Sequence, residues 1–415
     1  VTETLGDLYG MHWPYKQHQT SRNQKLLPYH EELKNAGACF GQSGEYERPM
    51  WYALESTKAE YEYSFNYQNW YPSVEHECKN TIENVGLFEL SPFSKYEIKG
   101  EKAYEELQRL CTANIKNEIG KCTYTHMLNE GAGIETDLTV VCLDKNYFRI
   151  ISSAAVRTHD KAHILKHLSN EVEFKDVTDD FVCLGIFGPK SRGLLSKTTK
   201  EDLSNDSFKF GTGKYIELNS TNVWVQRLSY VGELGYELYI KREDAKEIYD
   251  LIINKGKEFQ LSHCGAHAMD IMRMESGFLH WGHDISPEEN QYQAGLNFTI
   301  SFKKDFNFIS KEKLLKIKDN KQDKRFAMLV LKESNPGNPL LLHEEPIYLD
   351  NEIIGKTTSG NYSFNYNKNL SFGYIRSDLT SNDIVNKNLS IEIENKKYPA
   401  DLLLKPLKHN NFKNI

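Results

Sequence analysis

A single carboxylate, Asp137, follows a glycine-rich turn at the start of an apolar strand. The segment TYTHMLNEGAGIETDLTVVCLD passes through Gly-Ala-Gly, which permits positive φ and the close approach of a ligand, before it reaches this aspartate. An acid bordered by apolar residues suits general acid or base catalysis. Asp137 is therefore a candidate proton acceptor. The alternative is an aspartate that only makes ordinary hydrogen bonds in a turn.

A second carboxylate, Glu237, lies in the segment RLSYVGELGYELYI. The pattern predicts two short strands joined around GELG, with Glu237 on the face opposite to Tyr236 and Leu238. A carboxylate fixed on a strand can accept two parallel N–H bonds from an amino-pyrimidinone edge, as in a pterin. Tyr230 would stack on such a ring or hydrogen-bond to it. The alternative is a glutamate on an exposed strand face.

An arginine, Arg273, occurs within the mostly apolar helix predicted for CGAHAMDIMRMESGFLHWGHD. A buried charge without a partner costs several kcal/mol, so this arginine requires an acid beside it. Asp137 or the carboxylate of a ligand would supply that acid. The alternative is a structural ion pair with Asp270, Glu275 or another acidic residue.

Motifs for other common sites do not occur in the sequence. The segments GAGIET at 131 and GTGKY at 211 lack the spacing of a dinucleotide fingerprint, so no FAD or NAD site is predicted. The G-x-S-x-G motif of serine hydrolases is absent. His280, His283 and Asp284 cluster in HWGHD without the HExxH pattern, which favours turn and packing roles over metal binding. No metal site is predicted.

Composition and charge restrict the class of protein. Hydrophobic residues at 39% and charged residues at 26% exclude collagenous, disordered and membrane classes. A net charge of -7 argues against a nucleic-acid partner and favours a small-molecule ligand. The absence of a long apolar stretch and of an apolar signal-peptide core predicts a cytoplasmic location without membrane contact. Seven cysteines without a CxxC pair predict reduced, mostly buried thiols.

The elements that position these residues indicate an α+β protein with several domains. Residues 1–72, rich in Trp, Tyr, His and Pro, predict an irregular aromatic-packed extension. Residues 73–318 alternate strand and helix patterns, beginning with a strand pair in GLFELSPFSKYEIKG. Residues 319–415 contain short strands and turns that predict a small β-barrel. The other predicted helices lie at 154–169, 189–196, 242–256 and 263–278.

Taken in order, MLNE-GAGIETD, YVGELGYE, MRMESGF and GKTTSG resemble the glycine-cleavage T-protein (aminomethyltransferase) superfamily. The segments GMHWP, GACFG and ERPMWYA are similar to the folate-binding C-terminal half of dimethylglycine and sarcosine dehydrogenases. This resemblance implies a multi-domain cloverleaf around a folate channel, with a mixed α/β folate-binding domain and a C-terminal β-barrel. It implies tetrahydrofolate as the cofactor and an FAD-dependent oxidase, fused or separate, as a partner.

The resemblance also implies roles for individual residues. Asp137 matches the catalytic carboxylate near folate N5 and N10, and Arg273 matches an arginine beside the site. The cofactor-binding residues that it implies are Tyr124, Met127, Tyr230 and Glu237.

Three functions follow as hypotheses. The leading one is capture of the iminium or formaldehyde from an N-methyl amine such as dimethylglycine or sarcosine, giving 5,10-methylenetetrahydrofolate. The second is methyl transfer from a sulfonium such as dimethylsulfoniopropionate, which would give 5-methyltetrahydrofolate. The third is a module that binds folate or a partner without chemistry, because a fold does not establish a function.

Overall fold

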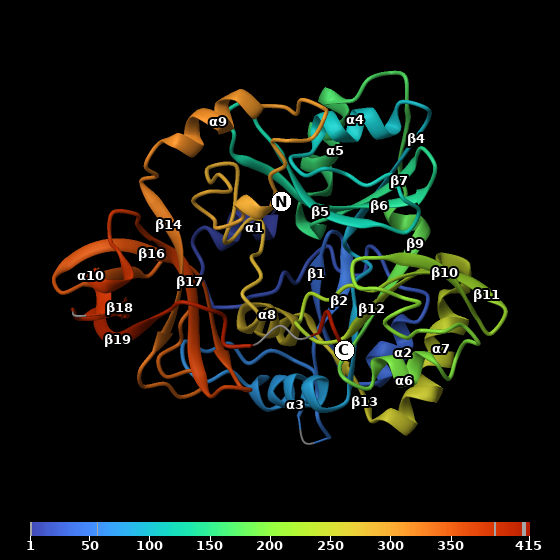
Figure 1. Ribbon diagram of the computed structural model, residues 1–415. Helices are drawn as coiled ribbons and strands as arrows, with labels where there is room; N and C mark the ends of the chain where they lie inside the picture. The colour runs from blue at the N-terminus through green and yellow to red at the C-terminus, as the bar shows by residue number, and fades with distance from the viewer. Residues whose placement is uncertain (1, 56, 386, 409–411) are drawn as a thin grey trace.

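The computed structural model describes residues 2–55, 57–385, 387–408 and 412–415. Three β-rich lobes surround a central helix, α8 (Ala266–Glu275), in Figure 1. The lobes are a five-stranded sheet, a six-stranded sheet and a closed barrel. The expected mixed α/β architecture with a C-terminal β-barrel is therefore confirmed.

The five-stranded sheet is antiparallel throughout and carries the segment around Asp137. One of its faces packs on α4 (Ala103–Leu110), whose Leu107 and Leu110 are buried as an amphipathic helix requires. In sheet order its strands are β5 (Cys122–Leu128), β6 (Ile134–Asp144), β7 (Tyr147–Ser152), β4 (Ser94–Lys99) and β8 (Glu173–Asp176).

The six-stranded sheet carries Glu237 and is antiparallel except for one parallel pair at its edge. Tyr236, Leu238 and Ile240 alternate along one strand and are all buried in one apolar cluster, so the predicted two-residue period is confirmed. In sheet order its strands are β10 (Gly213–Leu218), β11 (Thr221–Gln226), β12 (Gly235–Lys241), β9 (Phe181–Phe187), β3 (Val85–Glu89) and β13 (Leu261–Cys264).

The C-terminal barrel closes because its first strand pairs with both neighbours in the ring. Its interior contains aliphatic side chains such as Leu329, Ile347 and Ile391, all fully buried. In ring order its strands are β14 (Lys324–Leu331), β17 (Lys368–Arg376), β16 (Glu352–Ser363), β15 (Pro346–Leu349), β18 (Leu389–Ile393) and β19 (Lys396–Leu403).

Helices cover the sheets and join the lobes. The helix α8 contacts α3, β16 and β17, so it connects the sheets to the barrel. Within the described ranges, no helix is both long and apolar enough to cross a membrane. The remaining α-helices are α1 (Thr2–Asp7), α2 (His30–Asn35), α3 (Tyr71–Glu83), α5 (Arg157–His167), α6 (Ser191–Leu195), α7 (Ala245–Gly256), α9 (Lys311–Asp319) and α10 (Ser381–Val385). The 3-10 turns are η1 (Ala154–Val156), η2 (Thr178–Asp180), η3 (Arg242–Asp244), η4 (Lys257–Phe259) and η5 (Asn297–Thr299).

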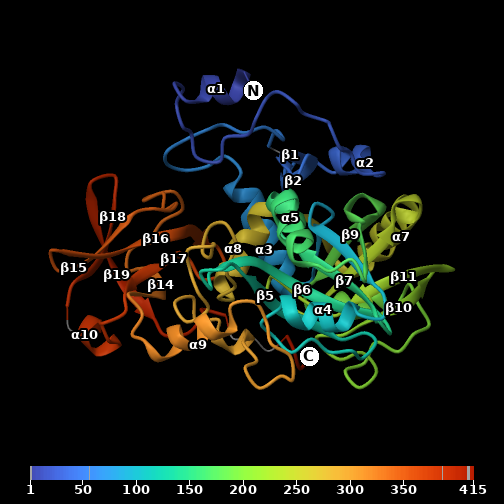
Figure 2. The same cartoon turned by 90° about the horizontal axis from the view of Figure 1, so that it is seen from above.

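The N-terminal residues form a layer along one side of the molecule, at the top of Figure 2. The aromatic packing expected there is present: the indole of Trp70 stacks on His267 at 4.2 Å between ring centroids, and Tyr15 packs edge-on against Trp70. The layer is less irregular than expected, because β1 (Ala38–Ser43) and β2 (Tyr46–Tyr52) pair as an antiparallel hairpin.

Three local expectations require correction. The strand pair predicted in GLFELSPFSKYEIKG is split between two sheets, β3 pairing with β9 and β13 and β4 with β7 and β8. The strand predicted before GELG ends at Gln226, and residues 227–234 form a loop. The helix predicted at 263–278 begins at Ala266, because the preceding residues extend β13 beside β3. Pairing partners distant in the chain decided the first and the third.

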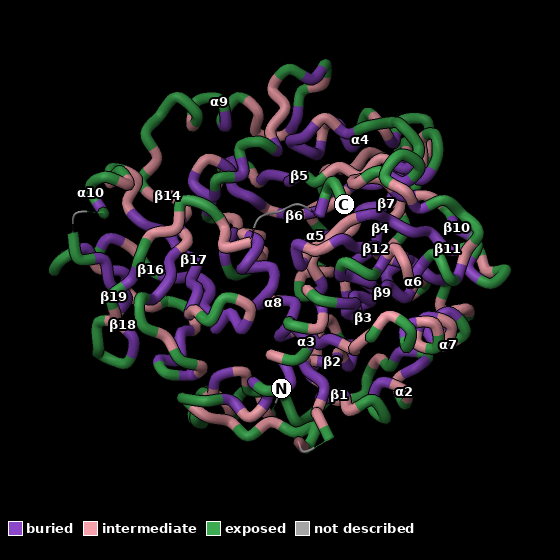
Figure 3. The backbone as a smooth tube through the Cα atoms, turned by 60° about the horizontal axis from the view of Figure 1, so that its bottom comes forward, coloured by how far each residue is buried: buried purple, intermediate pink, exposed green. Residues whose placement is uncertain are grey.

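The buried backbone concentrates where the lobes meet. Figure 3 shows α8 and the inner strands of the sheets as buried, whereas α9 lies mostly at the surface. Of the candidate functional residues, Arg273 lies on α8, and Asp137 and Glu237 lie on the inner strands β6 and β12.

Candidate functional site

Asp137 lies in the middle of β6, directly opposite His126 of β5. Its side chain is 17% exposed, and its Oδ1 atom is 3.5 Å from Nε2 of His126. This oxygen is buried and has no hydrogen-bond partner in the described part of the chain. Asp137 is thus a strand residue with an available acceptor atom, rather than an aspartate that caps a turn.

His126 is completely buried beside this carboxylate. Its Nδ1 is 3.0 Å from the Thr299 hydroxyl, and its Nε2 is 3.3 Å from the Tyr124 hydroxyl. Burial, and then the charge of Asp137, raise the pKa of Tyr124. Tyr124, His126 and Asp137 therefore form one titratable cluster on one face of the hairpin. Sequence reasoning missed His126, because only the strand register places it opposite the aspartate.

Met127 lies on the opposite face of the same hairpin. It pairs in register with Thr136, and adjacent strand residues point to opposite faces. Its side chain packs in the apolar cluster between the sheet and α4, with Leu107 and Cys111. The structure does not bring Met127 to the face that carries Asp137.

Contacts within the protein, rather than a ligand, account for the conformation of the Gly-Ala-Gly turn before β6. The side-chain oxygen of Asn129 accepts the backbone N–H groups of Gly131 and Gly133 at 2.8 and 2.9 Å. The positive φ of this turn, 66°, belongs to Ala132. A Cβ atom on Gly133 would lie 1.9 Å from the carbonyl oxygen of Pro287. Close packing of two loops therefore explains this glycine.

Glu237 lies on the face of β12 that points away from the main apolar cluster of its sheet. Its Oε2 accepts hydrogen bonds from the Tyr239 hydroxyl at 2.8 Å and from the Gln226 amide at 3.3 Å. No described residue hydrogen-bonds its Oε1. Burial raises the pKa of Glu237, and these two hydrogen bonds oppose that rise. The carboxylate is thus held by one oxygen, and the exposed-face alternative does not apply.

Tyr230 lies in the loop between β11 and β12. Its hydroxyl donates to the Leu279 carbonyl at 2.9 Å, and its ring stacks on Phe278 at 6.0 Å between centroids. Burial raises the pKa of Tyr230. The positive charge of Arg273 lowers this pKa, and the negative charge of Asp137 raises it. Tyr230 therefore packs against the segment that follows α8.

Arg273 is 1% exposed and forms a structural ion pair. It donates to Asp270 at 2.8 Å, to Asp284, and to the Phe278 carbonyl at 3.0 Å. Its remaining terminal nitrogen donates to the Ser359 hydroxyl of the barrel at 2.9 Å. The suggested pairing with Asp137 is not observed, and the structural alternative is confirmed.

Asp284 is the buried centre of this ion pair. Besides Arg273, it accepts hydrogen bonds from Thr358 at 2.6 Å, Ser359 at 2.7 Å and the backbone of His280 at 3.0 Å. Although burial opposes ionisation, the charge of Arg273 holds the pKa of neighbouring Asp270 below its ordinary value. The HWGHD turn thus ties α8 to the barrel, a packing role that its sequence predicted.

The five- and six-stranded sheets face each other across one shared apolar cluster. Val141 of the first sheet and Cys183 and Tyr239 of the second belong to it, and Tyr230 packs against it. Burial, and then the charge of Glu237, raise the pKa of the Cys122 thiol, which belongs to β5 at the edge of the same face. The Asp137 cluster and Glu237 therefore border one inter-sheet region from opposite sides.

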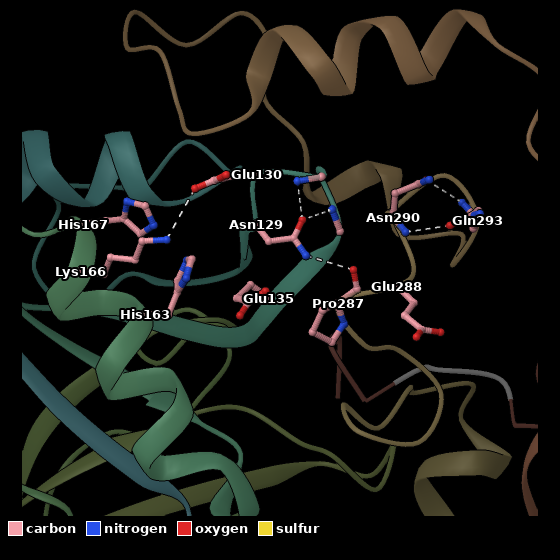
Figure 4. A pocket seen from close by; sticks show the side chains of 12 residues that line it. Asn129, Glu130, Glu135, His163, Lys166, His167, Pro287, Glu288, Asn290 and Gln293 are labelled. Atoms are coloured by element: carbon pink, nitrogen blue, oxygen red, sulfur yellow. Dashed lines mark hydrogen bonds and ion pairs between the residues drawn. The ribbon is translucent and has the colours of Figure 1, made fainter.

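A polar pocket of about 510 Å³ lies outside this region, next to the Gly-Ala-Gly turn. Figure 4 shows Asn129 at its centre, with His163 and Lys166 of α5 on one side and Pro287 on the other. Glu135, two residues before Asp137, also lines it. Its charged groups have both signs, and none of the predicted site residues lines it.

The grouping of potential metal ligands found in the described residues lies elsewhere. Glu3, Asp7 and His18 meet in the N-terminal layer. Glu3 already accepts backbone hydrogen bonds from Gln19 and Thr20, and Asp7 pairs with Lys16. This group has no contact with the Asp137 cluster.

Two family matches cover most of the chain. Residues 29–304 match the GCVT N-terminal domain, and residues 324–408 match the glycine cleavage T-protein C-terminal barrel domain. The crystal structure of glycine cleavage system aminomethyltransferase T from Bartonella henselae superposes with a TM-score of 0.78 at 22% identity, covering 93% of this chain and 98% of that one. This similarity shows the shared fold.

Two curated relatives are about twice as long as this chain. The 4-methylaminobutanoate oxidase (formaldehyde-forming) of Paenarthrobacter nicotinovorans is 35% identical over 405 residues, which are 97% of this chain and 48% of that protein. The mitochondrial dimethylglycine dehydrogenase of Homo sapiens is 34% identical over 390 residues, 92% of this chain and 44% of that protein. The chain thus spans about half the length of these relatives.

Proposed function

This chain belongs to the glycine cleavage T-protein family, and from that membership we propose that it transfers a one-carbon unit to tetrahydrofolate. It is an aminomethyltransferase-like domain related to dimethylglycine and sarcosine dehydrogenases. The proposed reaction captures the iminium or formaldehyde from N-methyl amine demethylation as 5,10-methylenetetrahydrofolate. Dimethylglycine and sarcosine are the proposed sources of the carbon.

The observation that carries this proposal is the carboxylate of Asp137. It is partly exposed and has a buried oxygen without a hydrogen bond, in a region bordered by Tyr124 and Tyr230. Tetrahydrofolate supplies the N5 and N10 nucleophiles when bound. Asp137 accepts the proton that N10 loses as the methylene bridge closes. Positioning supplies much of the remaining acceleration, because the electrophile is already reactive.

We propose that the pterin ring is held by Glu237 and by the tyrosines Tyr124 and Tyr230. The Oε1 atom of Glu237 has no partner among the described residues, and a pterin edge presents the N–H donors that it lacks. Tyr124 contacts His126 on the face of the hairpin that carries Asp137, and Tyr230 packs against the apolar cluster between the two sheets. Donor and acceptor types therefore fit a reduced folate.

In this proposal the other two predicted site residues, Arg273 and Met127, position the residues that contact folate. Arg273 holds the loop that bears Leu279, to which Tyr230 bonds, and so positions that tyrosine. Met127 packs between the hairpin and α4, and so holds the hairpin with Asp137 on the opposite face. Both assignments stay predictions.

An FAD-dependent oxidase domain or subunit is the proposed partner. The relatives that are about twice as long are called oxidase and dehydrogenase. Such a partner would oxidise the amine and deliver the electrophile to this domain. A cytoplasmic location stays a prediction.

We expect the chain to bind reduced folate and not FAD. Pterin-compatible donors and acceptors border the inter-sheet region, whereas the sequence has no dinucleotide fingerprint. Isothermal calorimetry with tetrahydrofolate and with FAD measures both. The absence of binding heat with millimolar tetrahydrofolate, or clear binding of FAD, would contradict the proposal. In a turnover assay, 5-methyltetrahydrofolate as the product, rather than 5,10-methylenetetrahydrofolate, would favour the sulfonium reaction.

Replacing Glu237 with glutamine should weaken folate binding by about 1.5–3 kcal/mol, the range for hydrogen bonds to a charged group. The amide would present a donor to the N–H groups of the pterin. Calorimetric Kd values for the variant and wild type give the difference. Glu217→Gln, on the exposed edge strand β10, is the matched control and should bind normally. Equal affinity of Glu237→Gln and wild type would remove Glu237 from the binding site.

A further inference from the structure

The side chain of His126 faces the proposed base, Asp137, with a ring nitrogen that carries no hydrogen in the neutral imidazole. Thr299 uses its hydroxyl hydrogen to bond the Leu296 carbonyl at 2.7 Å. The Thr299 oxygen can therefore only accept from His126, so Nδ1, at 3.0 Å, carries the imidazole proton. In the neutral ring, Nε2 then has a lone pair and no hydrogen.

Two acceptors consequently point at each other. Nε2 of His126 is 3.5 Å from Oδ1 of Asp137, longer than an ordinary hydrogen bond, and Oδ1 has no hydrogen-bond partner in the described residues. A carboxylate and an imidazole lone pair repel until a proton enters between them. A proton placed between them would give Oδ1 the partner that it lacks.

His126 is shielded from solvent, so a proton reaches it only through a neighbouring side chain. His126 has no exposed surface, whereas Asp137 is 17% exposed and Tyr124 is 39% exposed. The other neighbour of Nε2 is the Tyr124 hydroxyl at 3.3 Å, whose pKa is raised by burial and by Asp137. Tyr124 therefore stays protonated and donates its hydroxyl hydrogen to the Nε2 lone pair in the resting state, and this hydrogen bond must break before Nε2 takes a proton from Asp137.

We propose that His126 is a positioning residue that receives the catalytic proton from Asp137. The proposal rests on the proposed function and deepens it. As the C–N10 bond forms and the N10–H bond breaks, Asp137 accepts the proton and passes it to Nε2. The resulting imidazolium pairs with a regenerated carboxylate, which stabilises the charge in a buried place.

The protons balance without an oxidant or reductant. With an iminium as electrophile, the two N–H hydrogens of tetrahydrofolate are released: one leaves on the departing amine, and the other reaches solvent through the His126–Asp137 pair. With formaldehyde, both hydrogens end in the water that forms. The carbon keeps its oxidation level throughout.

A double-mutant cycle tests the relay. His126→Asn keeps an amide near the Nδ1 position and its bond to Thr299, but removes Nε2. We expect kcat for background-corrected methylene transfer to fall about tenfold to a hundredfold, with KM for tetrahydrofolate nearly unchanged. In an Asp137→Asn background the same change should cost less than about twofold, because the proton no longer arrives.

Thr299 offers a milder pair of variants if His126→Asn folds poorly. Thr299→Val keeps the size but removes the acceptor of Nδ1–H, whereas Thr299→Ser retains the hydroxyl. The valine variant should lose about threefold to tenfold in kcat, and the serine variant should recover it. Urea unfolding and folate affinity report whether either variant is only destabilised.

Nitrogen NMR of histidine-labelled protein gives a readout independent of turnover. The His126 signals, assigned by their loss in His126→Asn, should show a protonated Nδ1 and an unprotonated Nε2 in the free chain. An Nε2–H tautomer or a permanent imidazolium at neutral pH would overturn the relay. Equal losses from His126→Asn with and without Asp137 would also overturn it. Absence of methylene transfer by wild type overturns the proposed function itself, whereas a slow Asp137→Asn beside an unaffected His126→Asn removes the relay alone.

Discussion

Replacing Asp137 with asparagine should slow the trapping of formaldehyde as 5,10-methylenetetrahydrofolate by about 10²–10⁴-fold. The amide keeps the size of the side chain and removes the basic oxygen that faces His126. Folate affinity should change by less than about tenfold, because the proposed binding rests on Glu237 and the tyrosines. The measurement compares initial rates with calorimetric Kd values for variant and wild type.

The assay for Asp137→Asn requires two controls. Formaldehyde and tetrahydrofolate condense without enzyme, so that rate is subtracted, and coupling to an N-methyl amine oxidase keeps free formaldehyde low. Asp144→Asn, at the exposed end of the same strand, should trap at the wild-type rate. Trapping by Asp137→Asn as fast as wild type would make Asp137 a structural residue and the general-base mechanism wrong.

Replacing Asp284 with asparagine should lower the free energy of unfolding by about 3–5 kcal/mol, the cost of breaking a buried ion pair from one side. The asparagine would leave Arg273 with Asp270 as its remaining anion and would lose acceptor capacity toward Thr358 and Ser359. Because these bonds join α8 to the barrel, loss of the contact between lobes should accompany the loss of stability. Urea denaturation followed by far-UV circular dichroism measures it.

Asp206→Asn is the control for that experiment, since Asp206 is exposed and should tolerate the change within about 0.5 kcal/mol. Comparison of both single variants with the double variant Asp284→Asn/Arg273→Met separates the loss of the pair from the cost of leaving one charge unpaired. If Asp284→Asn unfolds at the urea concentration of wild type, the ion pair contributes nothing net to the fold.

Much of the secondary structure was predictable from local pattern. The alternation of apolar residues in YELYI predicted which face of β12 is buried, since side chains of a strand alternate. The short strands and turns after residue 319 predicted the barrel, which is observed. The division at residues 72/73 and 318/319 stays a prediction. The separation of β3 from β4 was not predictable, because both pair with strands that lie far along the chain, β3 with β9 and β13 and β4 with β7 and β8.

The candidate site shows the same limit in its individual residues. Asp137 and Glu237 were recognisable because an acid among apolar residues is conspicuous in a sequence. His126 was not, because a histidine in a strand pattern has no local mark of its neighbour. Arg273 was known to need an acid, but the choice of Asp284 over Asp137 depended on how α8 meets the barrel.

The sequence by itself determined the fold class and the family, and it selected Asp137 and Glu237 as the carboxylates proposed for chemistry. Local propensity, periodicity and motif spacing act within a few residues along the chain, and these features depend on nothing more. The tertiary structure alone decided which charges are paired, that Met127 faces away from Asp137, and that His126 faces Asp137 at 3.5 Å. Strand register and inter-lobe packing set those contacts, because they join residues that the chain separates and their energies depend on burial.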